Sequence, residues 1–164
     1  MMRRIISVLI ENEADALSRV VGLFAQRNYN IETLTVAPTE DATLSRMTIT
    51  TTAGDWQVEQ ITKQLHKLIE VVKLVDLTEG DHIERELLLI KLKASGAQRA
   101  EIKRTTDIFR GQIIDVTQSS YTVQLSGTSE KLDAFLRAVP EASVMEVVRS
   151  GVSGVSRGDK TLVN

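Results

Sequence analysis

The first residues that could do chemistry lie where an apolar segment meets a helical pattern. Asn12 and Asp15 follow the apolar residues 5–10 and precede residues 16–27, which carry apolar side chains at helical spacing. Backbone N–H groups in the first turn of a helix have no partner inside it, and the positive end of the helix dipole lies there. Such a turn can bind a carboxylate. An amino acid also needs acceptors for its ammonium group and a pocket for its side chain.

The same two residues also fit a purely structural interpretation. The Asp15 carboxylate can accept the free N–H groups of the first helical turn and so act as an N-cap. Asn12 is a common turn residue. On residue types alone, the structural interpretation is the more economical one.

The other polar side chains predict neither catalysis nor metal binding. His66 and His82 have no ligand spacing between them, and a metal site needs more ligands. Ser18 and Ser45 have no His or Lys partner at a suggestive spacing. Glu86 is expected to be a solvated charge at a strand edge. We therefore expect no catalytic residues and no metal ligands in this chain.

The elements around the turn form the first of two similar patterns. In the first half we expect strands over residues 3–10, 31–37, 44–52 and 71–77, with helices over 16–27 and 55–68. Asn28 stands where a helix ends with positive φ. In the second half we expect strands over residues 86–94, 112–116, 121–126 and 143–148. Helices are expected over residues 97–110 and after the cap residue Thr128.

The order β-α-β-β-α-β therefore occurs twice, which predicts an α+β fold of two ferredoxin-like βαββαβ domains. The polar segment around Gly80 suggests domains at 1–79 and 80–164, with a flexible glycine-containing tail from about residue 150. One face of each sheet would be bare, and about 80 residues give a marginal core. We therefore expect a homodimer.

Composition excludes several classes of protein. The chain has 164 residues, a formal net charge of −2, 42% hydrophobic residues and no cysteine. These values fit a folded cytoplasmic protein with no general affinity for nucleic acid or membrane. RNA-recognition domains share the βαββαβ order but stack bases on aromatic side chains, which are only 4% of residues here.

A series of motifs carries a family resemblance. Ser7-Val8-Leu9-Ile10-Glu11-Asn12-Glu13 with Ala16-Leu17-Ser18-Arg19-Val20 resembles the opening of an ACT domain. Later motifs resemble the small regulatory subunits of acetohydroxyacid synthase (acetolactate synthase). They are Tyr29-Asn30-Ile31-Glu32, Val36-Ala37-Pro38-Thr39, Leu44-Ser45-Arg46-Met47-Thr48, Lys63-Gln64-Leu65-His66-Lys67-Leu68, Glu84-Arg85-Glu86-Leu87, Ile108-Phe109-Arg110-Gly111, Ile113-Ile114-Asp115-Val116-Thr117, Arg149-Ser150-Gly151 and Ser156-Arg157-Gly158. The series covers nearly the whole chain in order.

The resemblance implies a non-catalytic regulatory subunit. Its partner would be a large catalytic subunit that binds thiamine diphosphate, Mg²⁺ and FAD and serves branched-chain amino-acid synthesis. The small subunit would raise the partner's activity and confer feedback inhibition, usually by valine. It would bind none of those cofactors itself. A free-standing ACT-type amino-acid sensor for another enzyme is the alternative, although it would not need the second half.

The resemblance also implies an effector site between two ACT domains. Matching the family by position gives one set of residues from one subunit: Asn12, Asp15, Ala16 and Leu17. Asn30 and Ile31 would come from the other subunit. Arg46 and Thr48, on an open strand face, are candidate contacts for the catalytic subunit, with a solvated or dimer-facing strand as an equal alternative.

One position departs from the family pattern: Asp15 stands where glycine is usual. Its carboxylate could cap the helix and compete for the N–H groups that the ligand needs. Two like charges about 4 Å apart at an effective dielectric of about 20 repel by roughly 4 kcal/mol. Pairing with the ligand's ammonium, or pointing toward solvent, would cancel much of this. The hypothesis is that valine binds weakly or that another effector is used.

Overall fold

The computed structural model describes residues 1–163, and the chain forms two compact units. The first contains residues 1–83 together with the residues from 152 onward, and the second contains residues 84–151. Each unit has a β-α-β-β-α-β order, which confirms the predicted fold class. Within the described residues, no helix is long and apolar enough to cross a membrane.

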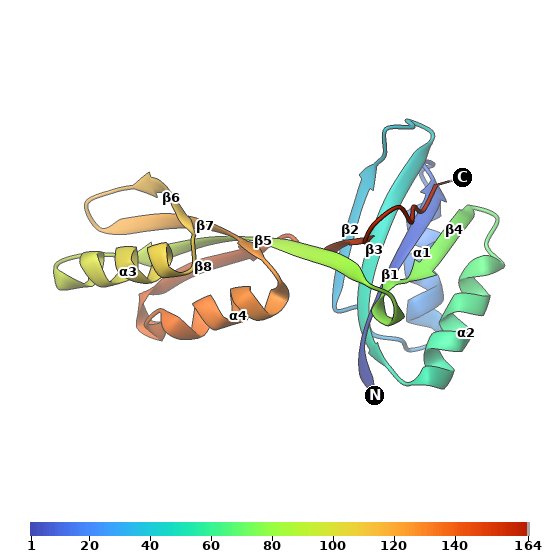
Figure 1. The fold of residues 1–164 in the computed structure, drawn as a ribbon, viewed down its shortest axis with the longest axis horizontal. Helices are drawn as coiled ribbons and strands as arrows, with labels where there is room; N and C mark the ends of the chain where they lie inside the picture. Colours follow the sequence, from blue (N-terminus) through green and yellow to red (C-terminus); the bar gives the residue numbers. More distant parts are fainter. Residues whose placement is uncertain (164) are drawn as a thin grey trace. The chain divides into compact units, whose positions relative to one another are not determined.

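The first unit is one antiparallel sheet with two helices on one face (Figure 1). Its elements are β1 (Met2–Glu11), α1 (Ala16–Gln26), β2 (Thr33–Pro38), β3 (Leu44–Ala53), α2 (Asp55–His66), β4 (Val71–Asp76) and the 3-10 helix η1 (Leu77–Glu79). The strand order is β2-β3-β1-β4. Ile6, Val8 and Ile10 alternate along β1 and face the helices, where they pack against Phe24 and Ile61.

The second unit repeats this arrangement with the strand order β6-β7-β5-β8. Its elements are β5 (His82–Lys93), whose first two residues belong to the first unit, α3 (Ala97–Ile108), β6 (Gln112–Val116), β7 (Ser120–Gly127), α4 (Ser129–Ala138), the 3-10 helix η2 (Glu141–Ser143) and β8 (Val144–Arg149). Leu88, Ile90 and Leu92 of β5 pack in its core with Leu132 and Phe135 of α4.

Two predicted helix boundaries are confirmed in detail. Asn28 has φ of 58°, and the N–H of Tyr29 donates to the Phe24 carbonyl oxygen at 2.9 Å. The Asn28 N–H donates to the Ala25 carbonyl oxygen at 3.2 Å, which completes a Schellman motif at the end of α1. At the start of α4, the Thr128 hydroxyl accepts a hydrogen bond from the Lys131 N–H.

The end of the chain differs from the expectation of a flexible tail belonging to the C-terminal domain. Residues from 152 onward cluster with the first unit, and β9 (Ser153–Ser156) forms there. Val152 is 1% exposed in a cluster with Ile5 and Leu77. These contacts lie on the sheet face opposite α1 and α2, along which the red end of the chain runs in Figure 1. We call residues 152–163 the C-terminal segment.

This segment also changes the expectation of a bare sheet face. Gly154 lies directly over β1, since a Cβ added there would be 2.9 Å from the Cδ1 atoms of both Ile5 and Leu77. The Gly154 carbonyl oxygen accepts a hydrogen bond from Arg46 Nη2 at 3.0 Å. The Val152 carbonyl oxygen accepts one from the Thr35 hydroxyl at 3.3 Å. Part of the predicted open face of the first sheet is therefore covered by the chain itself.

Candidate functional site

The turn between β1 and α1 is held by Asn12. Its backbone N–H donates to the Thr43 carbonyl oxygen at 2.8 Å, and its Nδ2 donates to the Ala42 carbonyl oxygen at 3.0 Å. Asn12 therefore has the structural role of a turn residue. Its Oδ1 receives no hydrogen bond from residues 1–163, so one acceptor remains for a ligand.

The start of α1 offers free backbone donors. The first helical hydrogen bond runs from the Arg19 N–H to the Asp15 carbonyl oxygen at 3.0 Å. Within the described part of the chain, nothing accepts a hydrogen bond from the N–H groups of Leu17 and Ser18. Ala16 is fully buried and Leu17 is exposed. Two donors at the positive end of a helix fit a carboxylate.

Asp15 occupies the N-cap position, but the predicted cap hydrogen bond is absent from this turn. Its side chain accepts nothing from the first turn of α1. The carboxylate instead pairs with Arg19 at 3.5 Å, and its side chain is 59% exposed. Arg19 also pairs with Glu70 at 2.8 Å. The expectation that Asp15 caps α1 is therefore wrong for this structure, and the N–H groups stay free.

Asn30 and Ile31 lie beyond the other end of the same helix. The Asn30 carbonyl oxygen accepts a hydrogen bond from the Thr51 hydroxyl, while its side chain is exposed. Ile31 packs partly against the first core. Since α1 has 11 residues, it is roughly 16 Å long. One amino-acid ligand cannot reach across that length, so Asn12 and Asn30 can share a ligand only if two copies of the chain contribute.

Arg46 and Thr48 lie on the covered face of the first sheet. Thr48 is 3% exposed, and the half-buried Arg46 donates to the Gly154 carbonyl oxygen. Burial lowers the pKa of Arg46. The two side chains therefore face the C-terminal segment and a cavity beside it, in place of the open strand face that we expected.

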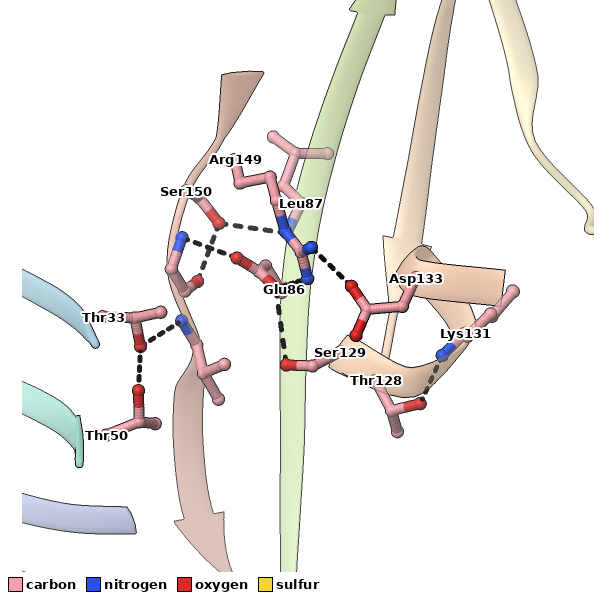
Figure 2. Close-up of polar contacts among 12 residues, drawn as sticks. Thr33, Thr50, Glu86, Leu87, Thr128, Ser129, Lys131, Asp133, Arg149 and Ser150 are labelled. Atoms are coloured by element: carbon pink, nitrogen blue, oxygen red, sulfur yellow. Dashed lines mark hydrogen bonds and ion pairs between the residues drawn. The ribbon is translucent and has the colours of Figure 1, made fainter. Parts of the chain in front are cut away.

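A buried ionic cluster in the second unit was missed. The Glu86 side chain, expected to be solvated, is 2% exposed. Its carboxylate accepts hydrogen bonds from Arg149 Nη2 at 2.6 Å, the Gly151 N–H at 3.0 Å and the Ser129 hydroxyl at 3.4 Å (Figure 2). Arg149 also pairs with Asp133 at 2.6 Å. The hydrogen bond to Glu86 is the main cause of a raised pKa for Arg149.

The sequence did contain a signal for this cluster. Glu86 is in phase with Leu88, Ile90 and Leu92, which face the core of the second unit. The carboxylate binds the backbone at the point where the chain leaves β8, which suggests a structural role. Within residues 1–163, no three His, Cys, Asp or Glu side chains form a group that could hold a metal ion.

Comparison with known proteins matches both units to one family. Residues 6–73 match the model of the AHAS small subunit-like ACT domain, and residues 85–158 match the model of the small subunit of acetolactate synthase. The chain is 64% identical over 162 residues to the acetolactate synthase isozyme 3 small subunit of Escherichia coli, covering 98% of this chain and 99% of that protein. It is 61% identical over 163 residues to the acetolactate synthase small subunit of Haemophilus influenzae, covering 99% of this chain and 100% of that protein.

A solved structure agrees with these matches. The crystal structure of the acetolactate synthase small subunit from Thermotoga maritima has a TM-score of 0.89 and 35% sequence identity. The match covers 98% of this chain and 100% of that one. Fold and sequence similarity thus extend over both units and the C-terminal segment.

Proposed function

Because this chain belongs to the family of acetolactate synthase small subunits, we propose that it binds a large catalytic subunit, raises its activity and makes it sensitive to a branched-chain amino acid. The observation that carries the proposal is the similarity of nearly the whole chain to small subunits of that enzyme. A free-standing amino-acid sensor would not account for the match of the second unit to the small-subunit model.

The catalytic chemistry belongs to the partner in this proposal. Thiamine diphosphate, Mg²⁺ and FAD are assigned to the catalytic subunit. The described residues of this chain offer no three-ligand group for a metal. This chain contributes regulation by binding.

We assign the effector site to the start of α1 in one protomer and the residues after α1 in a second. The free N–H groups of Leu17 and Ser18 would bind the ligand's carboxylate, and Asn12 Oδ1 would accept from its ammonium group. Asn30 and Ile31 of the second copy would complete the pocket. A homodimer is part of the proposal because the length of α1 separates the two halves within one chain.

Asp15 is expected to weaken valine binding through charge rather than through capping. Its carboxylate leaves the N–H groups free, but it adds a negative charge beside the place where the ligand's carboxylate would bind. The ion pair with Arg19 and the exposure of the side chain both screen this charge. We therefore use the dielectric constant of water, for which the repulsion between two carboxylates about 4 Å apart is about 1 kcal/mol. That energy corresponds to roughly fivefold in affinity.

Calorimetric titration with valine tests this step. We expect Asp15→Gly to bind valine about fivefold more tightly than the unaltered chain. Glu130→Gln removes an exposed acid from the first turn of α4 and should leave the affinity unchanged. Tight binding to the unaltered chain without improvement in Asp15→Gly would refute the role given to Asp15.

Reconstitution with the catalytic subunit of the same genome tests the function as a whole. Acetolactate formation should rise when this chain is added, and valine, leucine or isoleucine should lower it. No increase at any ratio of the two chains would overturn the proposal.

Contact of Arg46 and Thr48 with the catalytic subunit stays a prediction. Such a contact would require the C-terminal segment to move away from Thr48, which is buried beneath it. Unchanged activation by Arg46→Ala would remove Arg46 from the docking surface.

A further inference from the structure

A cavity of about 420 Å³ lies within the first unit, on the sheet face opposite α1 and α2. One wall is the hairpin of β2 and β3, and the other is formed by Ser153, Gly154 and Val155 of the C-terminal segment. Cavities that hold small molecules usually measure about 300–1,000 Å³. The space is therefore sufficient for a metabolite the size of an amino acid.

The cavity contains a cation that lacks a counterion. Arg46 is half-buried and donates to the Gly154 carbonyl oxygen, but no carboxylate within residues 1–163 forms an ion pair with it. A charge that is removed from water normally has an ionic partner, because desolvation without one costs free energy. The guanidinium has donors left for a planar oxyanion.

An anionic side chain and apolar surface line the same space. Glu40, in the turn after β2, is exposed and makes no ion pair with the described residues. Ala37, which lies opposite Arg46 on the same sheet face, and Val155 supply apolar lining. Arg46 and Glu40 also both line a neighbouring cavity of about 230 Å³, together with Asp41.

We propose that this cavity is a second amino-acid site, separate from the one at the start of α1. The ligand is an α-amino acid with a short aliphatic side chain. Its carboxylate binds Arg46, its ammonium group binds Glu40, and its side chain contacts Ala37 and Val155. A simple anion would use Arg46 but would be repelled by Glu40, so the pairing of both charges favours a zwitterion.

The consequence is that ligand binding at this site involves the C-terminal segment. The Gly154 carbonyl oxygen and the ligand would share the guanidinium of Arg46. Occupancy should therefore change the environment of Ser153, Gly154 and Val155, whereas the site at α1 should affect Leu17 and Ser18.

Backbone amide NMR of the labelled full-length protein can distinguish the two sites. L-valine is the probe, and the signals of Ser153 to Val155 report on the cavity. We expect these signals to shift with valine, and Arg46→Gln and Glu40→Gln each to weaken this response at least tenfold. Arg137→Gln is the control, since Arg137 is an exposed, unpaired cation in α4 of the second unit. The same titration with 3-methylbutanoate, which is valine without its ammonium group, should give at least tenfold weaker binding.

Three results would overturn the proposal. The first is no shift at Ser153 to Val155 up to the solubility limit of valine. The second is an unchanged response to valine in Glu40→Gln, whose exposed side chain can be replaced without disturbing the fold. An unchanged response to valine in both Arg46→Lys and Arg46→Gln would count in the same way. The third is binding of 3-methylbutanoate as tight as that of valine. Shifts confined to Leu17 and Ser18 would support the effector site at α1 while refuting this one, so the two proposals can fail separately.

Discussion

Replacing Gly154 by alanine tests whether the C-terminal segment is part of the first unit. The added Cβ would lie 2.9 Å from Ile5 Cδ1 and 2.9 Å from Leu77 Cδ1. Ordinary carbon–carbon contacts are about 3.5–4.0 Å, so both methyl groups would have to move by roughly 0.6 Å or more. Both side chains are 1% exposed, which leaves them little space in which to move.

Two opposing effects set the size of the change. Overpacking of a buried site costs typically about 1–3 kcal/mol. Alanine also restricts the unfolded chain, which stabilises by about 0.4–1 kcal/mol where the backbone conformation suits it. Gly154 is not among the glycines with positive φ, so that gain applies here. We expect a net loss of about 1–2 kcal/mol, or roughly 5–10 °C in the Tm of the first unit.

Differential scanning calorimetry of the full chain measures this shift. Gly80→Ala is a matched control, because a Cβ at Gly80 meets no atom within 4 Å. The control should keep the Tm of the unaltered protein or raise it slightly. If Gly154→Ala melted at the same temperature as Gly80→Ala, the packing of the C-terminal segment over Ile5 and Leu77 would be wrong.

Three further predictions concern the helix end, the ionic cluster and the hairpin turn. Asn28→Ala should lower the free energy of unfolding by about 1 kcal/mol in urea titrations, because φ of 58° is costly for alanine, whereas Asn28→Gly should not lower it. Glu86→Gln should lower the free energy of unfolding by about 3–5 kcal/mol because it breaks a buried ion pair with Arg149. Asp133→Asn removes the more exposed partner of Arg149 and should lower the free energy of unfolding by less than about 1 kcal/mol. Equal losses in the two variants would contradict the cluster. Hydrogen bonds from the Thr43 hydroxyl and N–H lower the pKa of Asp41 below 3.8. The ionised Asp41 carboxylate therefore stabilises the folded chain fully above pH 3.8, and this stabilisation is lost as the pH falls through the lowered pKa. Carboxyl NMR titration should show the pKa of Asp41 rising toward 3.8 in Thr43→Val.

The order of elements could be predicted because its signals are local. Alternation along β1 and helical spacing in α1 lie within single segments of the chain, and Asn28 marks a helix end by its own conformational tolerance. The free N–H groups at the start of α1 follow directly from the existence of the helix. The direction of the Asp15 side chain does not follow from the local sequence. It depends on the position of Arg19, which also pairs with Glu70 in the connection between α2 and β4.

Glu86 differs from the predicted solvated charge for a different reason. A carboxylate favours a solvated position, but the period-two pattern of β5 places Glu86 beside Leu88 on the core side. A buried carboxylate is acceptable there only because Arg149 and the backbone of Gly151 supply donors. Those donors are more than 60 residues away in sequence, so no local pattern could show that the charge is compensated.

The C-terminal segment was missed because glycine hides periodicity. Gly151, Gly154 and Gly158 interrupt the alternation that would mark a strand, and the contacts that order Gly154 are made with Ile5, near the other end of the chain. The same glycines explain the contact: with any Cβ at position 154, the backbone could not approach Ile5 and Leu77 so closely.

The position of this segment makes the first unit discontinuous in sequence. Ile5 and Leu77 are buried together with Val152, and Thr35 and Arg46 donate to carbonyl oxygens that come from the end of the chain. A chain that stopped after residue 79 would therefore lose part of the covering of one face of its own sheet, including apolar contacts of Ile5 and Leu77. The second unit is in this sense inserted into the first, and binding at the cavity beside Arg46 acts on the same residues that close the first domain.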